Sequence, residues 1–257
     1  MKIQNILERK KELWPGEKIV ELKFLIYSEN AIEGAMIALE RPEEAEIFLN
    51  DQQVTKEDQG WFVDKSIRKL PLPLLIAGEN HLVLRYPFRA GKFIEWSYLL
   101  GDFSVSVKGY KTKLGPPVNK LFFGDWTTQG LPFYAGNVTY HCQFPVEKEG
   151  KEMMLQFPRF ANPLLTIVTQ DGEKQQVIIP PYLAHLGQSQ GKNMMFEVTA
   201  YGNRINAFGS VHNPMKTYQW FGKEAWFTQG SSYSYEYCLK PMGILQSPII
   251  WKKDSEK

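Results

Sequence analysis

The sequence has little cysteine, little net charge and no long apolar run, and each shortage excludes a class of protein. Two cysteines in 257 residues, Cys142 and Cys238, allow at most one bridge, so the chain is no disulfide scaffold. Thirty Lys and Arg against 28 Asp and Glu leave a net charge of +2, which argues against nucleic-acid binding through a basic field. The longest apolar runs have the length of strands, so we expect no membrane partner.

The N-terminal sequence does not indicate the cellular compartment of the protein. Residues 1–5 lack the apolar core of a secretory signal, although an export sequence or a longer parent chain can have been removed. Free thiols suit the cytosol and equally an exported fragment without bridges. The localisation, cytoplasmic or exported, therefore stays open.

Recognisable catalytic motifs are also missing. The sequence has no Gly-x-Ser-x-Gly elbow, no Walker loop and no dinucleotide fingerprint. The two cysteines are isolated, and no two histidines have the spacing of a zinc pair on a helix. Two turn-like pairs, Asn50-Asp51 and Asp171-Gly172, offer calcium ligands but are better explained as turns. We expect no cofactor and no metal, and we expect that the chain is not an enzyme.

Three carboxylates keep an enzymatic alternative open. Glu95, Asp102 and Asp125 lie near aromatic residues, and glycosidases work with two carboxyl groups. The interpretation that we favour is that they accept backbone N–H bonds in turns. The alternative is a small jelly-roll hydrolase or lyase whose carboxylates converge only in three dimensions.

Short alternating segments predict a chain of strands. Apolar residues alternate with polar ones over residues 20–27, 82–86, 103–107, 138–144, 153–157 and 196–200, and a tyrosine row over residues 233–239 has the same period. Only residues 3–14 have helical spacing, which Pro15-Gly16 ends. Because no long helices intervene, the fold class is all-β, with sandwiches rather than parallel α/β units.

A basic segment with Gly and Pro over residues 108–119 shows no period and divides the chain. The predicted organisation is an N-terminal helix at residues 1–17, a first sandwich at 18–110, a linker at 111–123 and a second sandwich at 124–257. Two sandwiches of roughly 100–150 residues each fill the chain.

Aromatic residues are in surplus, at 14% of the chain, and several lie in loops rich in glycine and amides. A sugar has an apolar C–H face and polar hydroxyls, so its site needs an exposed ring beside Asn, Gln, Asp or Arg. The predicted ligand-binding residues are Trp126, Gln129, Tyr134, Tyr182, His185, Asn203, Arg204, His212 and Trp226. For each of them, a place in the core at a strand end is the alternative.

The order of these motifs is similar to that of a known family. Residues 124–126 (Gly-Asp-Trp), residues 129–136 and Tyr140 resemble the opening of a galactose-binding-like jelly roll, and residues 237–243 resemble its tail. Such modules accompany bacterial glycoside hydrolases of the β-galactosidase and α-rhamnosidase type. The resemblance implies two tandem jelly-roll β-sandwiches and a non-catalytic place beside a catalytic domain.

Three hypotheses follow for the function. The first is an accessory module that binds carbohydrate or supports a catalytic glycoside hydrolase domain. The second is the small enzyme described above. The third is a protein–protein scaffold, for which the Leu- and Pro-rich run at residues 70–76 would supply an apolar docking face.

Overall fold

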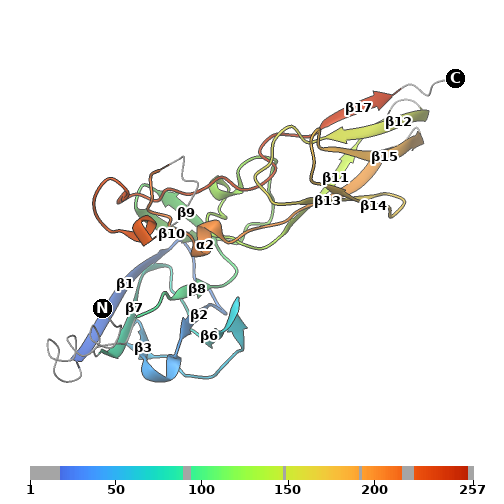
Figure 1. Cartoon of the computed structure of the whole chain (residues 1–257). Helices are drawn as coiled ribbons and strands as arrows, with labels where there is room; N and C mark the ends of the chain where they lie inside the picture. Colours follow the sequence, from blue (N-terminus) through green and yellow to red (C-terminus); the bar gives the residue numbers. More distant parts are fainter. Residues whose placement is uncertain (1–17, 89–93, 147–148, 191–192, 216–222, 254–257) are drawn as a thin grey trace. The chain divides into compact units, whose positions relative to one another are not determined.

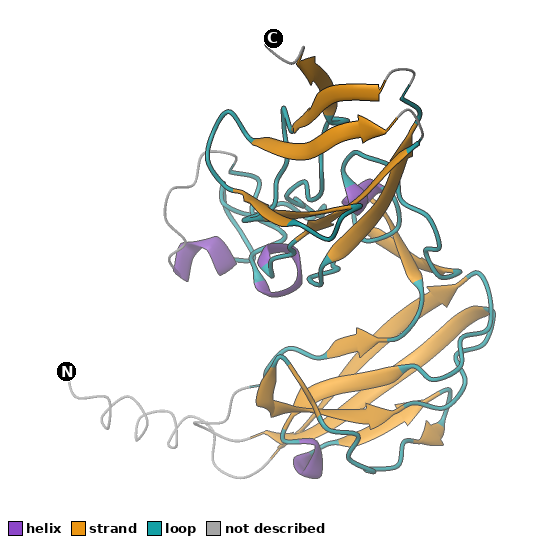
Figure 2. Ribbon diagram, turned by 90° about the vertical axis from the view of Figure 1, so that its right-hand side faces the viewer, coloured by secondary structure: helices purple, strands orange, loops and turns teal. Residues whose placement is uncertain are grey.

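The structure, a computed structural model, describes residues 18–88, 94–146, 149–190, 193–215 and 223–253. The helix predicted over residues 3–14 lies outside them. Strands dominate these residues (Figure 2), which confirms that the fold is mostly β. Within these described ranges, helical structure is limited to short pieces: η1 (Pro42–Glu44), η2 (Trp126–Thr128), α2 (Ile205–Phe208) and η3 (Lys223–Trp226). No helix in the described part of the chain has the length and apolarity needed to cross a membrane.

The chain divides into two compact units. Unit 1 comprises Met1–Ser104 and Thr112–Pro117, and unit 2 comprises Val105–Lys111 and Val118–Lys257. The chain changes unit in the hairpin of β9 (Ser104–Lys108) and β10 (Lys111–Gly115), labelled in Figure 1. The predicted linker begins here, but its first five residues are a strand. Leu114 is buried and lies opposite Ser28 of β1 in a parallel pairing, which accounts for the difference.

Unit 1 is built on two sheets, one in the order β4-β3-β7-β1-β10 and a four-stranded one in the order β5-β6-β2-β8. The remaining strands of these sheets are β1 (Lys18–Ser28), β2 (Met36–Glu40), β3 (Glu46–Leu49), β4 (Gln52–Gln53), β5 (Trp61–Phe62), β6 (Asp64–Pro71), β7 (Gly78–Phe88) and β8 (Tyr98–Leu100). Buried residues come from both sheets, among them Ile37, Leu70, Ile47 and Leu84. The core of unit 1 therefore lies between its sheets.

Unit 2 also has two sheets, in the orders β11-β16-β13-β14 and β15-β12-β17. Their bounds are β11 (Val138–Phe144), β12 (Glu149–Gln156), β13 (Leu165–Thr169), β14 (Lys174–Val177), β15 (Leu183–Gln190), β16 (Met194–Ala200) and β17 (Ile249–Lys253). One core cluster joins Ile167 and Val198 of the first sheet to Met153 and Leu155 of the second. This is the packing of a sandwich, in which alternate side chains of each strand face inward.

Turn chemistry sets the hairpins as the sequence predicts. Asn50 and Asp51 both have positive φ, 51° and 63°, between β3 and β4, as a type I′ turn requires. Gly172 has a φ of 82° between β13 and β14, and its N–H donates to the Thr169 carbonyl. Both pairs serve as turns. Cys142 and Cys238 are free thiols.

The predicted tyrosine strand at residues 233–239 is wrong. The described residues between β16 and β17 contain α2 and η3 but no strand. Single backbone bonds hold this segment instead: Tyr237 N–H donates to the Gly109 carbonyl at 3.0 Å, and Cys238 N–H donates to the Val211 carbonyl at 2.6 Å. Alternation gives the segment an extended shape, but a strand also needs a continuous ladder of partners.

Candidate functional site

Two exposed tyrosines meet on unit 2. Tyr110, 55% exposed, lies at the tip of the β9–β10 hairpin, and Tyr235, 69% exposed, lies in the strand-free segment before β17. Their ring centroids are 5.4 Å apart at an interplanar angle of 66°. The bond from Tyr237 N–H to the Gly109 carbonyl holds the two segments together. Gly109 has a φ of 63°, which lets the hairpin turn here.

The same segment carries a second aromatic group around His212. The His212 ring lies 4.7 Å from the Tyr237 ring and 5.9 Å from the Tyr233 ring. Ser234 N–H donates to the His212 carbonyl at 2.7 Å, so the backbone of the two loops is joined as well. We call Tyr110, Tyr233, Tyr235, Tyr237 and His212 the tyrosine surface.

Charged groups flank these rings. The Lys111 ammonium lies 5.8 Å from the centre of the Tyr110 ring. The Glu236 carboxylate lies beside Gly109, so close that a Cβ added to this glycine would be 3.2 Å from one of the carboxylate oxygens. Burial raises the pKa of the Tyr237 hydroxyl. The tyrosine surface thus offers flat rings with donors and acceptors beside them.

Of the nine predicted residues, only His212 lies in this surface. The prediction that Trp126 is an exposed binding residue is wrong. Its side chain is 0% exposed and belongs to the core of unit 2, so its ring cannot serve as an exposed platform. The cause is the anchoring of η2. The Asp125 carboxylate accepts from the backbone N–H of Thr127 and of Met242, and Trp126 N–H donates to the Met242 carbonyl. These bonds fold the loop over the core.

Two predicted amides are occupied by backbone groups. The Gln129 side chain accepts from Phe122 N–H at 2.9 Å and donates to the Phe122 carbonyl at 3.2 Å. The Asn203 side-chain oxygen accepts from Ile205 N–H at 3.0 Å, at the start of α2. Arg204 beside it is exposed. Both amides stabilise loop conformation, a common role for Asn and Gln near turns.

The other predicted aromatic side chains are spread over unit 2. Tyr134 is exposed, and its hydroxyl donates to the Asn137 carbonyl at 3.2 Å. Tyr182 is half-buried and meets Phe160 edge-on. The exposed His185 lies 3.3 Å from Glu152 on the neighbouring strand.

Trp226, in η3, is 47% exposed. Among the predicted residues, the structure brings the rings of Trp126 and Tyr134 together, with centroids 6.4 Å apart at an interplanar angle of 77°. Trp126 is buried, however, so this pair offers one exposed ring and not two.

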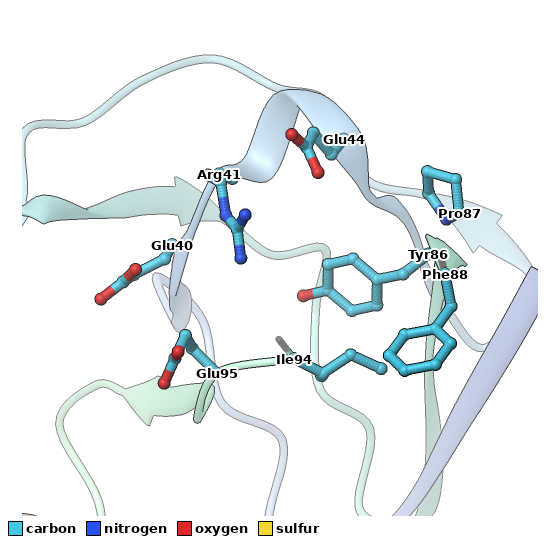
Figure 3. A pocket seen from close by; sticks show the side chains of 8 residues that line it. All are labelled: Glu40, Arg41, Glu44, Tyr86, Pro87, Phe88, Ile94 and Glu95. Atoms are coloured by element: carbon cyan, nitrogen blue, oxygen red, sulfur yellow. The ribbon is translucent and has the colours of Figure 1, made fainter. Parts of the chain in front are cut away.

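The predicted carboxylates also separate. Asp125 caps η2 in unit 2, and Asp102 is exposed in a bend of unit 1. Glu95 lines a pocket of unit 1 together with Glu40, Arg41 and Tyr86 (Figure 3). Figure 3 shows the Arg41 guanidinium and the Tyr86 hydroxyl pointing into the space beside Glu40 and Glu95.

This unit 1 pocket is small. Its volume is about 20 Å³, which is close to the space of one water molecule. Burial raises the pKa of the Tyr86 hydroxyl, and burial with the nearby Glu40 and Glu95 charges raises that of Tyr98. Among the described residues, no group of three or more His, Cys, Asp or Glu side chains has the arrangement of a metal site.

Comparison with known proteins adds a distant likeness. No protein-family model matches the chain, and no curated protein matches it. A rhamnosidase from Novosphingobium sp. PP1Y is similar over 96% of this chain, with 12% identity and a TM-score of 0.35. An anti-sigma factor domain-containing protein is similar over 72% of this chain and 76% of its own, with 9% identity and a TM-score of 0.22.

The chain spans about a quarter of the rhamnosidase, 26% of its length. At these TM-scores neither likeness supports an argument about function. The site therefore has to be judged from its own chemistry.

Proposed function

We propose that this chain is a non-catalytic carbohydrate-binding accessory module of two tandem galactose-binding-like jelly-roll sandwiches. In this proposal it accompanies a glycoside hydrolase whose carboxylates belong to another domain or chain. The observation that supports it best is the exposed contact pair of Tyr110 and Tyr235, with Lys111 and Glu236 beside it.

The physical reason is the two-sided chemistry of a sugar ring. Its C–H face loses little by leaving water and gains contact with an aromatic plane, while its hydroxyls need donors and acceptors. Tyr110 and Tyr235 lie at 66° to each other, so they offer ring faces in two directions to one chain of sugars. Lys111 beside the Tyr110 ring and Glu236 beside Gly109 supply a donor and an acceptor for such hydroxyls.

Two observations weigh against the alternatives. An enzyme with Glu40 and Glu95 as its carboxylates would need room for a sugar ring, and a pocket of about 20 Å³ holds little more than one water molecule. For a scaffold, the run at residues 70–76 exposes Leu74 and Ile76, but it buries Leu70, Leu72 and Leu75 in the core. Of its leucine and isoleucine side chains, only Leu74 and Ile76 are left exposed.

A glycan array tests the proposal with the full chain. We expect binding to at least one plant or microbial polysaccharide, and we expect the Tyr110→Ala/Tyr235→Ala variant to lose it. Tyr134→Ala is the matched control, because Tyr134 is also exposed but lies outside the tyrosine surface. Binding that survives in the double variant would contradict the site, and silence of the wild-type chain over a broad panel would contradict the function.

A further inference from the structure

A second place in unit 2 has the properties of a ligand site. A hollow of about 500 Å³ lies against β11, β13 and β16 near the β13–β14 turn. Its lining includes His141, Gln143, Gln170, Met195 and Glu197. All five are exposed, and on β11 and β16 they alternate with inward-facing residues, which places the hollow on the outer face of the sheet. Its volume lies within the range of small-ligand sites, roughly 300–1,000 Å³.

The amides of this hollow are free, in contrast to those of the predicted loops. Gln129 bonds to the backbone around it, and Gln175 uses both ends of its amide on the His185 backbone. Gln143 and Gln170 make no such bond within the described residues, and both line the hollow. An amide without a protein partner can donate to one hydroxyl and accept from another.

The ionisable side chains of the hollow lie side by side. The His141 Nδ1 lies 3.0 Å from a Glu197 carboxylate oxygen, and among the described lining residues these two are the only Asp, Glu, Lys, Arg or His. Burial raises the pKa of the Cys142 thiol to about 11, so the thiol is neutral at physiological pH. Met195, 51% exposed, and Val168 add apolar surface. A surface with free amides, one carboxylate beside an imidazole and an apolar patch suits a neutral, hydroxylated ligand.

We propose that this hollow is a second binding site for a neutral oligosaccharide, held by the Gln143 and Gln170 amides over Met195. The inference shares the ligand class of the proposed function but none of its residues. Sugar hydroxyls bond to the two amides and to the His141–Glu197 pair, and a C–H face covers the methionine. Two sites on one unit would make the chain bivalent for a polysaccharide, which raises its avidity without new contacts.

Titration of the ¹⁵N-labelled full chain with maltose, cellobiose and lactose tests this inference. We expect one of these disaccharides to shift the amide signals of residues 141–143, 168–172 and 195–197. The Gln143→Ala/Gln170→Ala variant should bind about tenfold more weakly at this site, because it loses several hydrogen bonds. Gln176→Ala is the matched control, since Gln176 is exposed on β14 but does not line the hollow.

The outcomes separate the two sites. Shifts at the hollow that persist in the Tyr110→Ala/Tyr235→Ala variant support the second site, even if the tyrosine surface binds nothing. Shifts confined to residues 109–111 and 233–237 overturn the second site and leave the proposed function standing. No shift at the hollow with any of the three disaccharides, or equal affinity of the glutamine double variant, also overturns it.

Discussion

The two units share a plan and differ in what they leave open to solvent. Each has two sheets with a core between them, yet unit 1 has an acidic pocket of about 20 Å³, whereas unit 2 has an open hollow of about 500 Å³ and a pair of exposed tyrosines. In unit 1, η1 alone separates β2 from β3, and it contributes Glu44 to the pocket. In unit 2, a long segment before β17 carries the aromatics. The two units are thus alike in their sheets and differ in the surface features that the sheets and loops expose.

The largest loss of stability is expected at Trp126, a buried aromatic residue of unit 2 that the sequence places in a loop. Trp126→Ala should destabilise unit 2 by about 3–5 kcal/mol, because it empties a fully buried site. Denaturant unfolding followed by circular dichroism measures this. The control is Trp226→Ala, at an exposed tryptophan, which should cost much less. Similar costs for the two variants would contradict the burial of Trp126.

A smaller effect distinguishes a capping carboxylate from a solvated one. Asp125→Ala should cost about 1–2 kcal/mol, because its carboxylate accepts from the Thr127 N–H and hydroxyl and from Met242 N–H. Asp102→Ala in unit 1 should change stability by less than about 0.5 kcal/mol, since that side chain is exposed. If thermal unfolding ranks the two in the opposite order, the structural role of Asp125 is wrong.

The smallest effect compares two buried tyrosine hydroxyls. In the described part of unit 2 the Tyr140 hydroxyl is buried without a hydrogen-bond partner, whereas the Tyr86 hydroxyl of unit 1 bonds to Ser97. Tyr140→Phe should therefore be neutral or stabilise by up to about 1 kcal/mol, and Tyr86→Phe should cost about 0.5–1.5 kcal/mol. Equilibrium unfolding at pH 7 measures both, and a clear loss in Tyr140→Phe would show a missed partner.

The same tyrosine gives a pH dependence. Burial raises the pKa of Tyr140 to about 12 from an ordinary value of 10.0. Because the unfolded chain releases this proton first, the stabilising contribution is complete below pH 10 and is lost as pH rises toward 12. Unit 2 should weaken over this window, and Tyr140→Phe should weaken less. Identical alkaline profiles for wild type and variant would contradict the buried hydroxyl.

The strands could be predicted where alternation and turn chemistry agree. Residues 138–144 alternate strictly and form β11, and Asp171-Gly172 closes a hairpin as expected. The tyrosine row at 233–239 has the same period and is no strand, because the period shows which residues share a face but not whether a neighbouring strand is there to pair.

The candidate site was harder to predict because exposure depends on tertiary structure. Trp126 and Tyr110 both follow glycine-containing segments, yet one is buried and the other exposed. The difference arises from Asp125 and Met242, which are far apart in sequence and meet only in the fold. The sequence also cannot distinguish a Gln side chain that bonds to the backbone from one that is open to a ligand, because this too depends on tertiary structure. One signal was present: Gly109-Tyr110 places an aromatic at a turn, where its ring projects into solvent.

We expect the array-positive glycan to bind at the tyrosine surface of unit 2 and not at the carboxylate pocket of unit 1. Calorimetric titration of the full chain with an array-positive glycan tests it most directly. We expect Tyr110→Ala/Tyr235→Ala to lower affinity by about tenfold or more, through loss of two ring contacts, and Glu40→Gln/Glu95→Gln to leave affinity unchanged. Unchanged affinity in Tyr110→Ala/Tyr235→Ala, or a comparable loss of affinity in Glu40→Gln/Glu95→Gln, would contradict this expectation.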